Sequence, residues 1–453
     1  MSHRSNRTIA LTTLGCKVNQ SDSDEWLRQF VARGYDIVDF NAVADAYVVN
    51  TCSVTHVADR KSRQLLRHAR RQNPAALVVA TGCYASVAPE EVARMVEVDL
   101  VIGDQGKPRL VETVHQALEG AEEQPLETLT GPLRAFGPRH RGFVKVSDGC
   151  NKFCAFCIVP YARGRTRSVE SNAVVGTIDA LVADGYREVV LTAVHIGNYG
   201  FDLTPPTTLG ALIDRALAET AVERLRISSI EPEDFDDRLL TRWSDPRLCR
   251  HFHLALDSGC DATLERMRRR YRASEYRSLV RRIRAAIPEV AITTDVMVGF
   301  PGETDQEFEV SYQFVAEQEF ALIHVFPYSP RRRTTASKLP GSVDPETRQR
   351  RTDQMLTLAR ESASHFRQRF VGRTVSVLFE QPAPVRDGPP AWEGLTDNYL
   401  RVRAPSERDL ANSILSVCLD GVEDDALVGH LVGPPSDPAT RLACRVELTS
   451  ASR

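Results

Sequence analysis

Residues 143–157 read FVKVSDGCNKFCAFC, and this stretch decides how the rest of the chain is interpreted. Its apolar start, Phe143–Val146, predicts a buried β-strand. Three cysteines follow at spacings of four and three residues: Cys150, Cys154 and Cys157. A loop of this length can hold its thiolates around one small inorganic centre. A closed metal site takes four protein ligands, so three predict a centre with one position open to a substrate or cofactor.

A zinc site completed by a distant residue such as His195 is the alternative for this loop. Structural zinc usually takes its ligands from CxxC-type pairs, which favours the open centre.

A second group of cysteines shares a position relative to predicted strands. Cys16, Cys52 and Cys83 end the segments ALTTLGC, AYVVNTC and VVATGC. Strand-to-helix loops of a parallel sheet emerge at one edge, so the three thiols should converge there on a second open centre. Buried cysteines acting as small hydrophobes are the alternative, but they need not occupy the same strand end three times. The remaining cysteines are expected to be structural: Cys249, Cys260, Cys418 and Cys444.

The composition is that of an ordinary globular protein. The 453 residues suffice for two or three domains, with 42% hydrophobic residues, 26% charged residues and a net charge of −3. No apolar run reaches the length of a membrane span, and the N-terminal residues lack a signal peptide. We therefore expect a cytoplasmic protein without a membrane partner, in a reducing compartment where cysteines serve as ligands.

The order of apolar runs predicts an α/β protein of three parts. In residues 1–120, runs at Ile9–Leu14, Ala46–Val49, Leu77–Ala80 and Leu100–Ile102, with a helix over Asp24–Ala32 capped by Gly34, predict an open parallel sheet. Residues 121–140 are rich in glycine and proline and predict a linker. Residues 141–370 contain six strand–helix units, which predict a partial or full parallel barrel. The strands are expected at Phe143–Val146, Val189–Thr192, Leu225–Ser228, His251–Leu256, Ile292–Val298 and Leu322–Phe326, and two of the helices at Asp305–Glu317 and Pro345–Arg369.

The tail, residues 371–449, predicts a small all-β module, a barrel related to the nucleic-acid-binding OB type. Its strands are expected at Val375–Phe379, Leu400–Val402, Ser416–Leu419 and Leu442–Leu448.

Taken together, these features resemble the radical SAM methylthiotransferases. The CxxxCxxC loop continues as IVPYARGRTRS, and the tail segment EGLTDNYL, from Glu393, is similar to the TRAM signature of that family. The segments LGCKVNQSDSD and NTCSVTHVADRKSRQ are most similar to the enzymes that modify N6-threonylcarbamoyladenosine beside the tRNA anticodon.

The resemblance implies two 4Fe–4S clusters, on Cys150, Cys154 and Cys157 and on Cys16, Cys52 and Cys83. The first would bind S-adenosylmethionine and cleave it to a radical that removes the hydrogen at C2 of adenine. The second would deliver sulfur, and a second S-adenosylmethionine the methyl group. An electron donor of the flavodoxin or ferredoxin kind and a sulfur source are implied as partners. The residues expected near the cofactor are Glu231, Asp257, Asp295, Gly299, Pro301, Gly302 and Glu303. Ordinary turn geometry is the alternative for the glycines. Asp257 departs from the family, which usually has glutamine there.

Arginines indicate where RNA would bind. The chain has 51 arginines against six lysines, a skew that codon bias could also produce. Residues 266–284 hold nine arginines against one acid, whereas solvated faces normally mix charges. Phosphate contacts are expected from Arg268, Arg269, Arg270, Arg272, Arg281, Arg282, Arg331, Arg332 and Arg333. Tyr399 is expected either to stack on a base or to belong to the core of the module.

Two further hypotheses remain open from the sequence. One keeps the chemistry but changes the substrate to another tRNA adenosine or to a ribosomal protein side chain. The other is a non-catalytic RNA-binding protein whose cysteines hold zinc.

Overall fold

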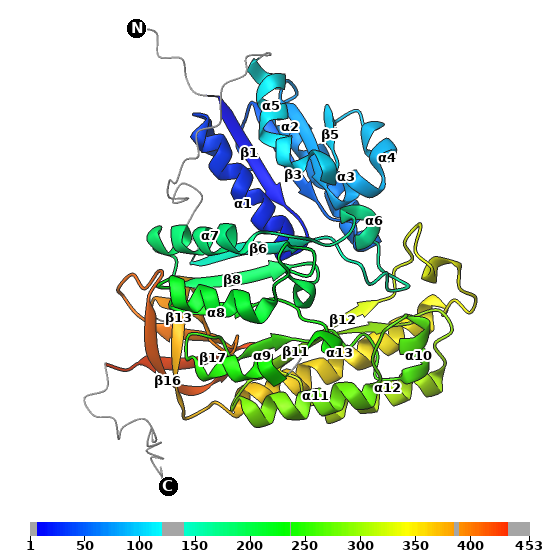
Figure 1. Ribbon diagram of the computed structural model, residues 1–453, viewed down its shortest axis with the longest axis vertical. Coiled ribbons are helices and arrows are strands. Elements are labelled where there is room, and N and C mark those ends of the chain that lie inside the picture. Colours follow the sequence, from blue (N-terminus) through cyan, green and yellow to red (C-terminus); the bar gives the residue numbers. More distant parts are fainter. Residues whose placement is uncertain (1–6, 120–139, 236, 385–388, 434–453) are drawn as a thin grey trace.

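The computed structural model describes residues 7–119, 140–235, 237–384 and 389–433. Three β-structures follow one another along the chain, in blue, green to yellow, and orange to red (Figure 1). The N-terminal part lies at one end of the molecule, above the central part, and the C-terminal barrel lies beside the lower half of the central part.

The N-terminal sheet has five parallel strands in the order β2-β1-β3-β4-β5. All six residues of β3 are buried, as a strand covered on both faces requires. The strands are β1 Thr8–Thr13, β2 Asp36–Val38, β3 Ala46–Thr51, β4 Leu77–Gly82 and β5 Leu100–Ile102. The helices are α1 Lys17–Ala32, α2 His56–Gln72, α3 Cys83–Val87, α4 Pro89–Ala93 and α5 Leu110–Glu119, with a 3-10 turn η1 at Asp104–Arg109.

Helix α1 begins seven residues before the expected start. Asp22, Ser23 and Asp24 lie inside it and are buried, and Asp22 pairs with Lys145 of the central part. The end was predicted correctly, since Gly34 has φ +83° just beyond the C-cap residue.

The central part is a partial barrel. Its six parallel strands lie in two ladders, β6-β8-β9 and β10-β11-β12, which the bridges Leu225–Leu248 and Ile230–Leu254 connect. The short strand β7 pairs antiparallel with β6 at one end of the row, and β12 forms the other end. The strands are β6 Arg141–Asp148, β7 Arg167–Ser168, β8 Glu188–Ala193, β9 Arg224–Ile227, β10 His251–His253, β11 Ala291–Val298 and β12 Leu322–Pro327.

Helices cover the outside of this barrel and bury a large apolar core against it (Figure 1). They are α6 Val159–Arg163, α7 Ser171–Ala183, α8 Leu209–Glu219, α9 Asp237–Leu240, α10 Asp261–Arg266, α11 Ala273–Ala286, α12 Asp305–Glu317 and α13 Pro345–Gln368. The 3-10 turns are η3 Ile196–Asn198, η4 Pro232–Asp234, η5 Thr241–Ser244 and η6 Ala336–Lys338.

The C-terminal part is a closed five-stranded barrel, β13-β14-β15-β17-β16, as the expected small β module requires. Phe366 and Phe370, in and just after α13, pack into its core. The strands are β13 Thr374–Pro382, β14 Ala391–Thr396, β15 Arg401–Pro405, β16 Ile414–Glu423 and β17 Ala426–Leu431. The strand expected at Leu442–Leu448 and the linker residues 121–139 lie outside the described residues. Among the described helices, none is long and apolar enough to cross a membrane.

Candidate active site

The loop after β6 curls so that its three thiols face one another. Cys150 donates its backbone N–H to the Gly164 carbonyl at 3.0 Å, and Cys157 donates to the Cys154 carbonyl at 3.0 Å. Gly149 has φ +73°, and a Cβ there would lie 2.1 Å from the Arg165 carbonyl oxygen. The turn into the cysteine loop therefore requires glycine. Burial raises the pKa of Cys157, and the neighbouring Cys154 and Cys150 thiols raise it further.

Cationic groups surround this cysteine loop. Arg269 Nη1 lies 3.4 Å from Cys154 Sγ and pulls the pKa of that thiol down against the effect of burial, which raises it. His195 Nε2 lies 2.5 Å from Asp234 Oδ2. Burial disfavours the imidazolium, but hydrogen bonds to Asp234 and Cys150 outweigh it and raise the pKa of His195 to about 9. Positive charge near thiolates favours their ionised, ligating form.

The second group of cysteines also converges. Cys16, Cys52 and Cys83 follow β1, β3 and β4, which are neighbours in the sheet. Burial raises the pKa of Cys52 to about 11, and the Cys83 and Cys16 thiols beside it add to the shift. A Cβ at Gly15 would lie 2.9 Å from Cys52 Sγ, so glycine leaves room for that thiol.

Arg163 joins the two cysteine groups. It belongs to α6, directly after the cysteine loop, and its side chain is only 2% exposed. Its guanidinium donates to Asp148 at 2.7 Å and to Asn19 of α1, and it hydrogen-bonds the Cys83 thiol. The contact therefore brings the N-terminal cysteines against the barrel. The segment YARGR carries this residue, but its sequence did not show that the arginine spans two parts of the chain.

A carboxylate network on α1 strengthens the same contact. Asp22 accepts from Lys107 at 2.9 Å and from Lys145 of β6, and it lies 3.6 Å from Arg163. Three positive charges hold the pKa of Asp22 below its usual range despite burial.

The chemistry of both cysteine groups fits iron–sulfur clusters. Each group offers three free thiols in one place, and no described cysteine joins either group as a fourth ligand. A cluster bound in this way keeps one iron free for another ligand. His195, the distant residue of the zinc alternative, lies beside Cys150, and its Nε2 atom is bonded to Asp234.

The residues expected near the cofactor line the mouth of the barrel, with Arg269 between two of them. Arg269 pairs with Glu231 after β9 and lies 3.1 Å from Asp257 after β10. Burial raises the pKa of Asp257 to about 6, against the opposing effect of Arg269. Arg269 thus compensates the negative charge of Asp257, which stands where the family usually has glutamine. This pairing keeps the Arg269 side chain away from solvent. The expectation that Arg269 contacts RNA phosphates is therefore wrong.

The turn after β11 is held by its own contacts. Glu303 accepts the Gly299 N–H at 2.8 Å and pairs with Arg351 of α13 at 2.8 Å. Gly302 donates its N–H to the Gly341 carbonyl at 2.7 Å. The Glu303 carboxylate therefore shapes the turn, in which Pro301 is buried and the N–H groups of Gly299 and Gly302 are already bonded. Asp295 lies deeper, within β11, and pairs with His253 Nε2 at 3.2 Å.

Comparison with known proteins places these features in a family. Residues 8–103 match the family described as Uncharacterized protein family UPF0004, and residues 144–315 match the Radical SAM superfamily. The threonylcarbamoyladenosine tRNA methylthiotransferase MtaB of Bacillus subtilis is 35% identical over 421 residues, covering 90% of this chain and 93% of that protein. The chain belongs to the radical SAM tRNA methylthiotransferases. It is accordingly an enzyme that uses S-adenosylmethionine and iron–sulfur clusters to modify tRNA.

Other relatives of this methylthiotransferase differ in the nucleoside that their names state. MtaB of Aquifex aeolicus is 35% identical over 415 residues, 90% of this chain and 98% of that protein. A tRNA-2-methylthio-N(6)-dimethylallyladenosine synthase of Geobacillus kaustophilus is 32% identical over 441 residues, 94% of this chain and 82% of that protein. Among solved structures, the radical S-adenosylmethionine methyltransferase TsrM of Kitasatospora setae has a TM-score of 0.52 at 16% identity, covering 71% of this chain and 73% of that one, which shows a shared fold.

Seven of the nine arginines expected to bind RNA are exposed, and they lie in three groups. Arg268, Arg270, Arg332 and Arg333 are exposed beside the mouth of the methylthiotransferase barrel and form no ion pair within the described residues. Arg281 and Arg282 lie about 14 Å further along α11, given a rise of 1.5 Å per residue from Arg272. Arg272 at the N-terminus of α11 is exposed and lies 3.9 Å from Asp261.

Two other residues expected to contact RNA, Arg331 and Tyr399, instead lie in contacts between parts of the chain. Arg331 is 7% exposed and pairs with Asp59 of α2 at 2.7 Å, so it joins the N-terminal part to the barrel. Tyr399 lies under the C-terminal barrel, stacked on His251 with ring centroids 4.6 Å apart and with Arg226 4.7 Å from its ring. It belongs to the junction between the two barrels, where Lys17 and Arg141 also lie near its ring.

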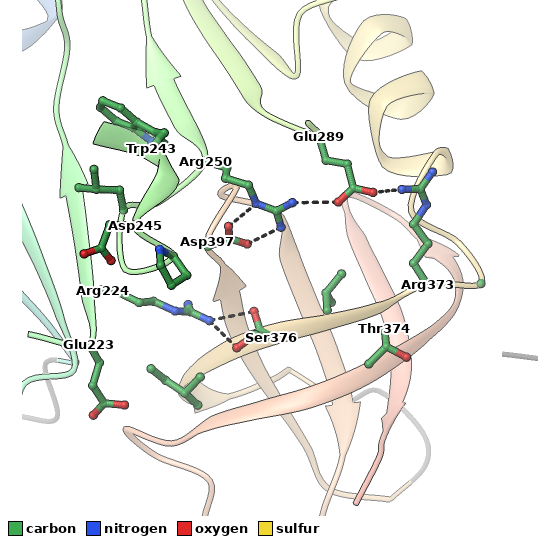
Figure 2. Close-up of a pocket in the computed structure, with 15 residues that line it drawn as sticks. Glu223, Arg224, Trp243, Asp245, Arg250, Glu289, Arg373, Thr374, Ser376 and Asp397 are labelled. Carbon is green, nitrogen blue, oxygen red and sulfur yellow. Dashed lines mark hydrogen bonds and ion pairs between the residues drawn. The ribbon is translucent and has the colours of Figure 1, made fainter. Parts of the chain in front are cut away.

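The cleft drawn in Figure 2 lies at the opposite end of the barrel from the cysteines. Arg224, Arg250 and Glu289, at or just before the first residues of β9, β10 and β11, line it together with residues of β13. Its arginines are engaged: Arg224 donates to Ser376 at 2.9 Å, and Arg250 pairs with Asp397 at 2.6 Å. This cleft lies where the central barrel and the C-terminal barrel meet, and it is not the catalytic site.

Proposed function

We propose that this enzyme inserts a methylthio group at C2 of N6-threonylcarbamoyladenosine next to the tRNA anticodon. The observation that carries the proposal is the pair of three-cysteine groups, one at the barrel mouth and one at the edge of the N-terminal sheet, held together by Arg163. Support for the nucleoside comes from relatives of 35% identity whose names state threonylcarbamoyladenosine.

Each cysteine group is assigned its own role. Cys150, Cys154 and Cys157 would hold the 4Fe–4S cluster that reduces S-adenosylmethionine, and Cys16, Cys52 and Cys83 the cluster that supplies sulfur. When bound, these groups provide the radical and the sulfur, while the protein provides placement and shielding.

The protein residues around the first group tune charge and position. Arg269 offsets one of the two negative charges of Asp257 and Glu231 beside Cys154, which reduces the repulsion of an electron-rich centre at the mouth. Glu231 and Asp257 are the carboxylates available to the ammonium group of S-adenosylmethionine, and the turn at residues 299–302 offers backbone groups to its adenine. Asp148 and Asn19 hold Arg163 in place, which fixes the spacing between the two cysteine groups.

The exposed arginines at the mouth would bind tRNA phosphates. A small reducing protein of the flavodoxin or ferredoxin kind and a separate sulfur source complete the proposed set of partners.

The direct test is reconstitution with defined RNA. Enzyme purified without oxygen and loaded with iron and sulfide should be brown and should convert an anticodon stem-loop carrying N6-threonylcarbamoyladenosine to its 2-methylthio form. Colourless protein that binds zinc in its place would overturn the proposal. Conversion of the N6-dimethylallyl stem-loop alone would assign the other nucleoside.

A further inference from the structure

The inside of the central barrel is open to solvent along its last strand. On β12, Leu322, His324 and Phe326 are exposed, Leu322 and Phe326 by 37% and 42%, whereas Ile323 between them is 4% exposed. Ile323 packs into the core beneath the outer helices, so the exposed set faces the barrel interior. An apolar ring such as Phe326 exposed inside a polar hollow is suited to stacking on a base.

Lys17 reaches into this interior from the N-terminal part. It is the first residue of α1, and α1 contacts β6 and β8. Its Nζ atom lies 5.6 Å from the centre of the Tyr399 ring. Burial lowers the pKa of His251 and of His324, and the nearby positive charge of Lys17 lowers both further.

Lys17 differs from the other largely buried lysines in lacking an acidic partner. Lys107 pairs with Asp22 at 2.9 Å, Lys145 pairs with the same carboxylate, and Lys152 pairs with Glu233 at 2.6 Å. Within the described residues, Lys17 has no hydrogen bond and no ion pair, only the contact with the Tyr399 ring.

The surroundings of Lys17 add positive charge. Arg226 and Arg141 lie over the same Tyr399 ring at 4.7 Å and 5.8 Å, and their carboxylate partners, Glu188 and Glu380, are already engaged. His251, stacked on that ring, is kept neutral, because burial and then Arg226 and Lys17 lower its pKa strongly. Lys17 is partly buried, and a partly buried ammonium group without a counter-ion costs free energy, which an incoming anion would recover.

The chain order ties the backbone of Lys17 to the sulfur-supplying cysteines, while its Nζ atom reaches through the barrel interior to the Tyr399 ring. Lys17 directly follows Cys16, a proposed ligand of the sulfur-supplying cluster, and neighbouring Cα atoms are about 3.8 Å apart. C2 and the N6 substituent belong to the same adenine ring. An adenine whose C2 faces that cluster therefore carries its N6 substituent within reach of the barrel interior.

We propose that Lys17 binds the carboxylate of the N6 substituent and so selects a nucleoside with an anionic side chain. The assignment rests on the proposed function. His253, Asp295 and His324, whose ligating atoms lie within 4.8 Å of one another on three adjacent strands, then face the uncharged carbamoyl and hydroxyl groups of the substituent. A dimethylallyl group offers no charge to compensate Lys17 and is disfavoured in this site.

The test compares two RNAs on the reconstituted holoenzyme. One anticodon stem-loop carries N6-threonylcarbamoyladenosine, and the other carries the same nucleoside with its carboxylate converted to a methylamide. The wild-type enzyme should show a kcat/KM about 10- to 100-fold lower for the amide, mainly through KM, as expected for loss of a hydrogen bond between charged groups. Lys17→Met should react with the two RNAs almost equally, whereas Lys17→Arg should retain part of the preference.

Lys61→Met, at an exposed position of α2, is the matched control and should retain the full wild-type preference. Iron content and visible absorption report whether each variant holds its clusters. If Lys17→Met loses its clusters, the comparison of the two RNAs with the wild-type enzyme decides whether the carboxylate is recognised. Equal kcat/KM for both RNAs with the wild-type enzyme, or a preference that survives Lys17→Met, overturns the assignment. Failure of the wild-type enzyme to modify either RNA would contradict the proposed function instead.

Discussion

The Asp257 carboxylate is buried, and the fold removes most of the water around it. Burial is the largest cause that raises its pKa to about 6, Glu231 and Asp295 add to it, and Arg269 opposes it. The proton is therefore bound more tightly in the folded than in the unfolded chain, where the pKa is near 4. The stability that this proton contributes is fully present below pH 4 and is lost as the pH rises through 6.

Asp257→Asn removes this dependence. The free energy of unfolding of the variant relative to wild type should increase by about 2 to 2.5 kcal/mol between pH 4 and pH 7.5. Denaturant unfolding of the two proteins across this range measures it, with Asp353→Asn at an exposed position of α13 as the control for loss of a surface carboxylate. A difference that stays constant with pH would show that Arg269 keeps Asp257 ionised throughout.

The two cysteine groups predict separable defects. Cys154→Ala should abolish formation of 5′-deoxyadenosine, because it removes a ligand of the cluster that reduces S-adenosylmethionine. Cys52→Ala should still form 5′-deoxyadenosine but should leave the nucleoside without sulfur. Chromatography of the small-molecule and nucleoside products measures both. Normal 5′-deoxyadenosine from Cys154→Ala, or normal methylthiolation by Cys52→Ala, would contradict the roles assigned.

The elements β8 and β9 depend on one buried ion pair. Arg226 donates to Glu188 at 2.7 Å with both side chains fully buried, and it also donates to the Thr396 and Asp397 carbonyls of the C-terminal barrel. Breaking a buried pair leaves a charge without its counter-ion.

Glu188→Gln should lower the free energy of unfolding by about 3–5 kcal/mol. Chemical denaturation is the measurement, and Glu219→Gln, in the exposed Arg215–Glu219 pair of α8, should change stability little. Equal effects of the two substitutions would mean that the Arg226 contacts to backbone carbonyls suffice.

Individual elements show what the sequence could and could not predict. The apolar runs located all six barrel strands, because the strands packed beneath the outer helices keep runs of apolar residues, even in β12, which is exposed on one face. Strands β14 and β17 were missed because each contains a glycine, Gly394 or Gly429. A Cβ at either would lie 2.2 Å or 2.1 Å from a carbonyl oxygen of the next strand, so the small barrel needs glycine where a pattern suggests a break. The start of α1 was missed because its first turns contain polar residues that are buried, such as Asp22, which pairs with Lys107 and Lys145.

At the scale of the whole molecule, the meeting of the cysteines followed from a general rule of parallel sheets. The contacts that join the three parts did not, because Arg163, Arg331 and Tyr399 acquire their roles only when those parts dock. An arginine-rich segment alone cannot distinguish Arg269, buried at the site, from Arg268 and Arg270 on either side of it, which are exposed.

The exposed mouth arginines should account for part of the salt dependence of tRNA binding. Arg332→Ala and Arg333→Ala should each weaken binding and lower the slope of log K against log salt by about 1. Filter binding at several salt concentrations measures the slope, with Arg94→Ala on α4, in its exposed pair with Glu90, as the control. An unchanged slope for both variants would mean that tRNA phosphates do not contact these two arginines and that the RNA binds elsewhere on the molecule.

The most direct test of the account is mass spectrometry of nucleosides from total tRNA of a strain that lacks this protein. We expect 2-methylthio-N6-threonylcarbamoyladenosine to disappear and its unthiolated precursor to accumulate, with recovery on expression of the wild-type chain but not of Cys154→Ala. A nucleoside profile identical to that of the parent strain would contradict the assignment of tRNA N6-threonylcarbamoyladenosine as the substrate.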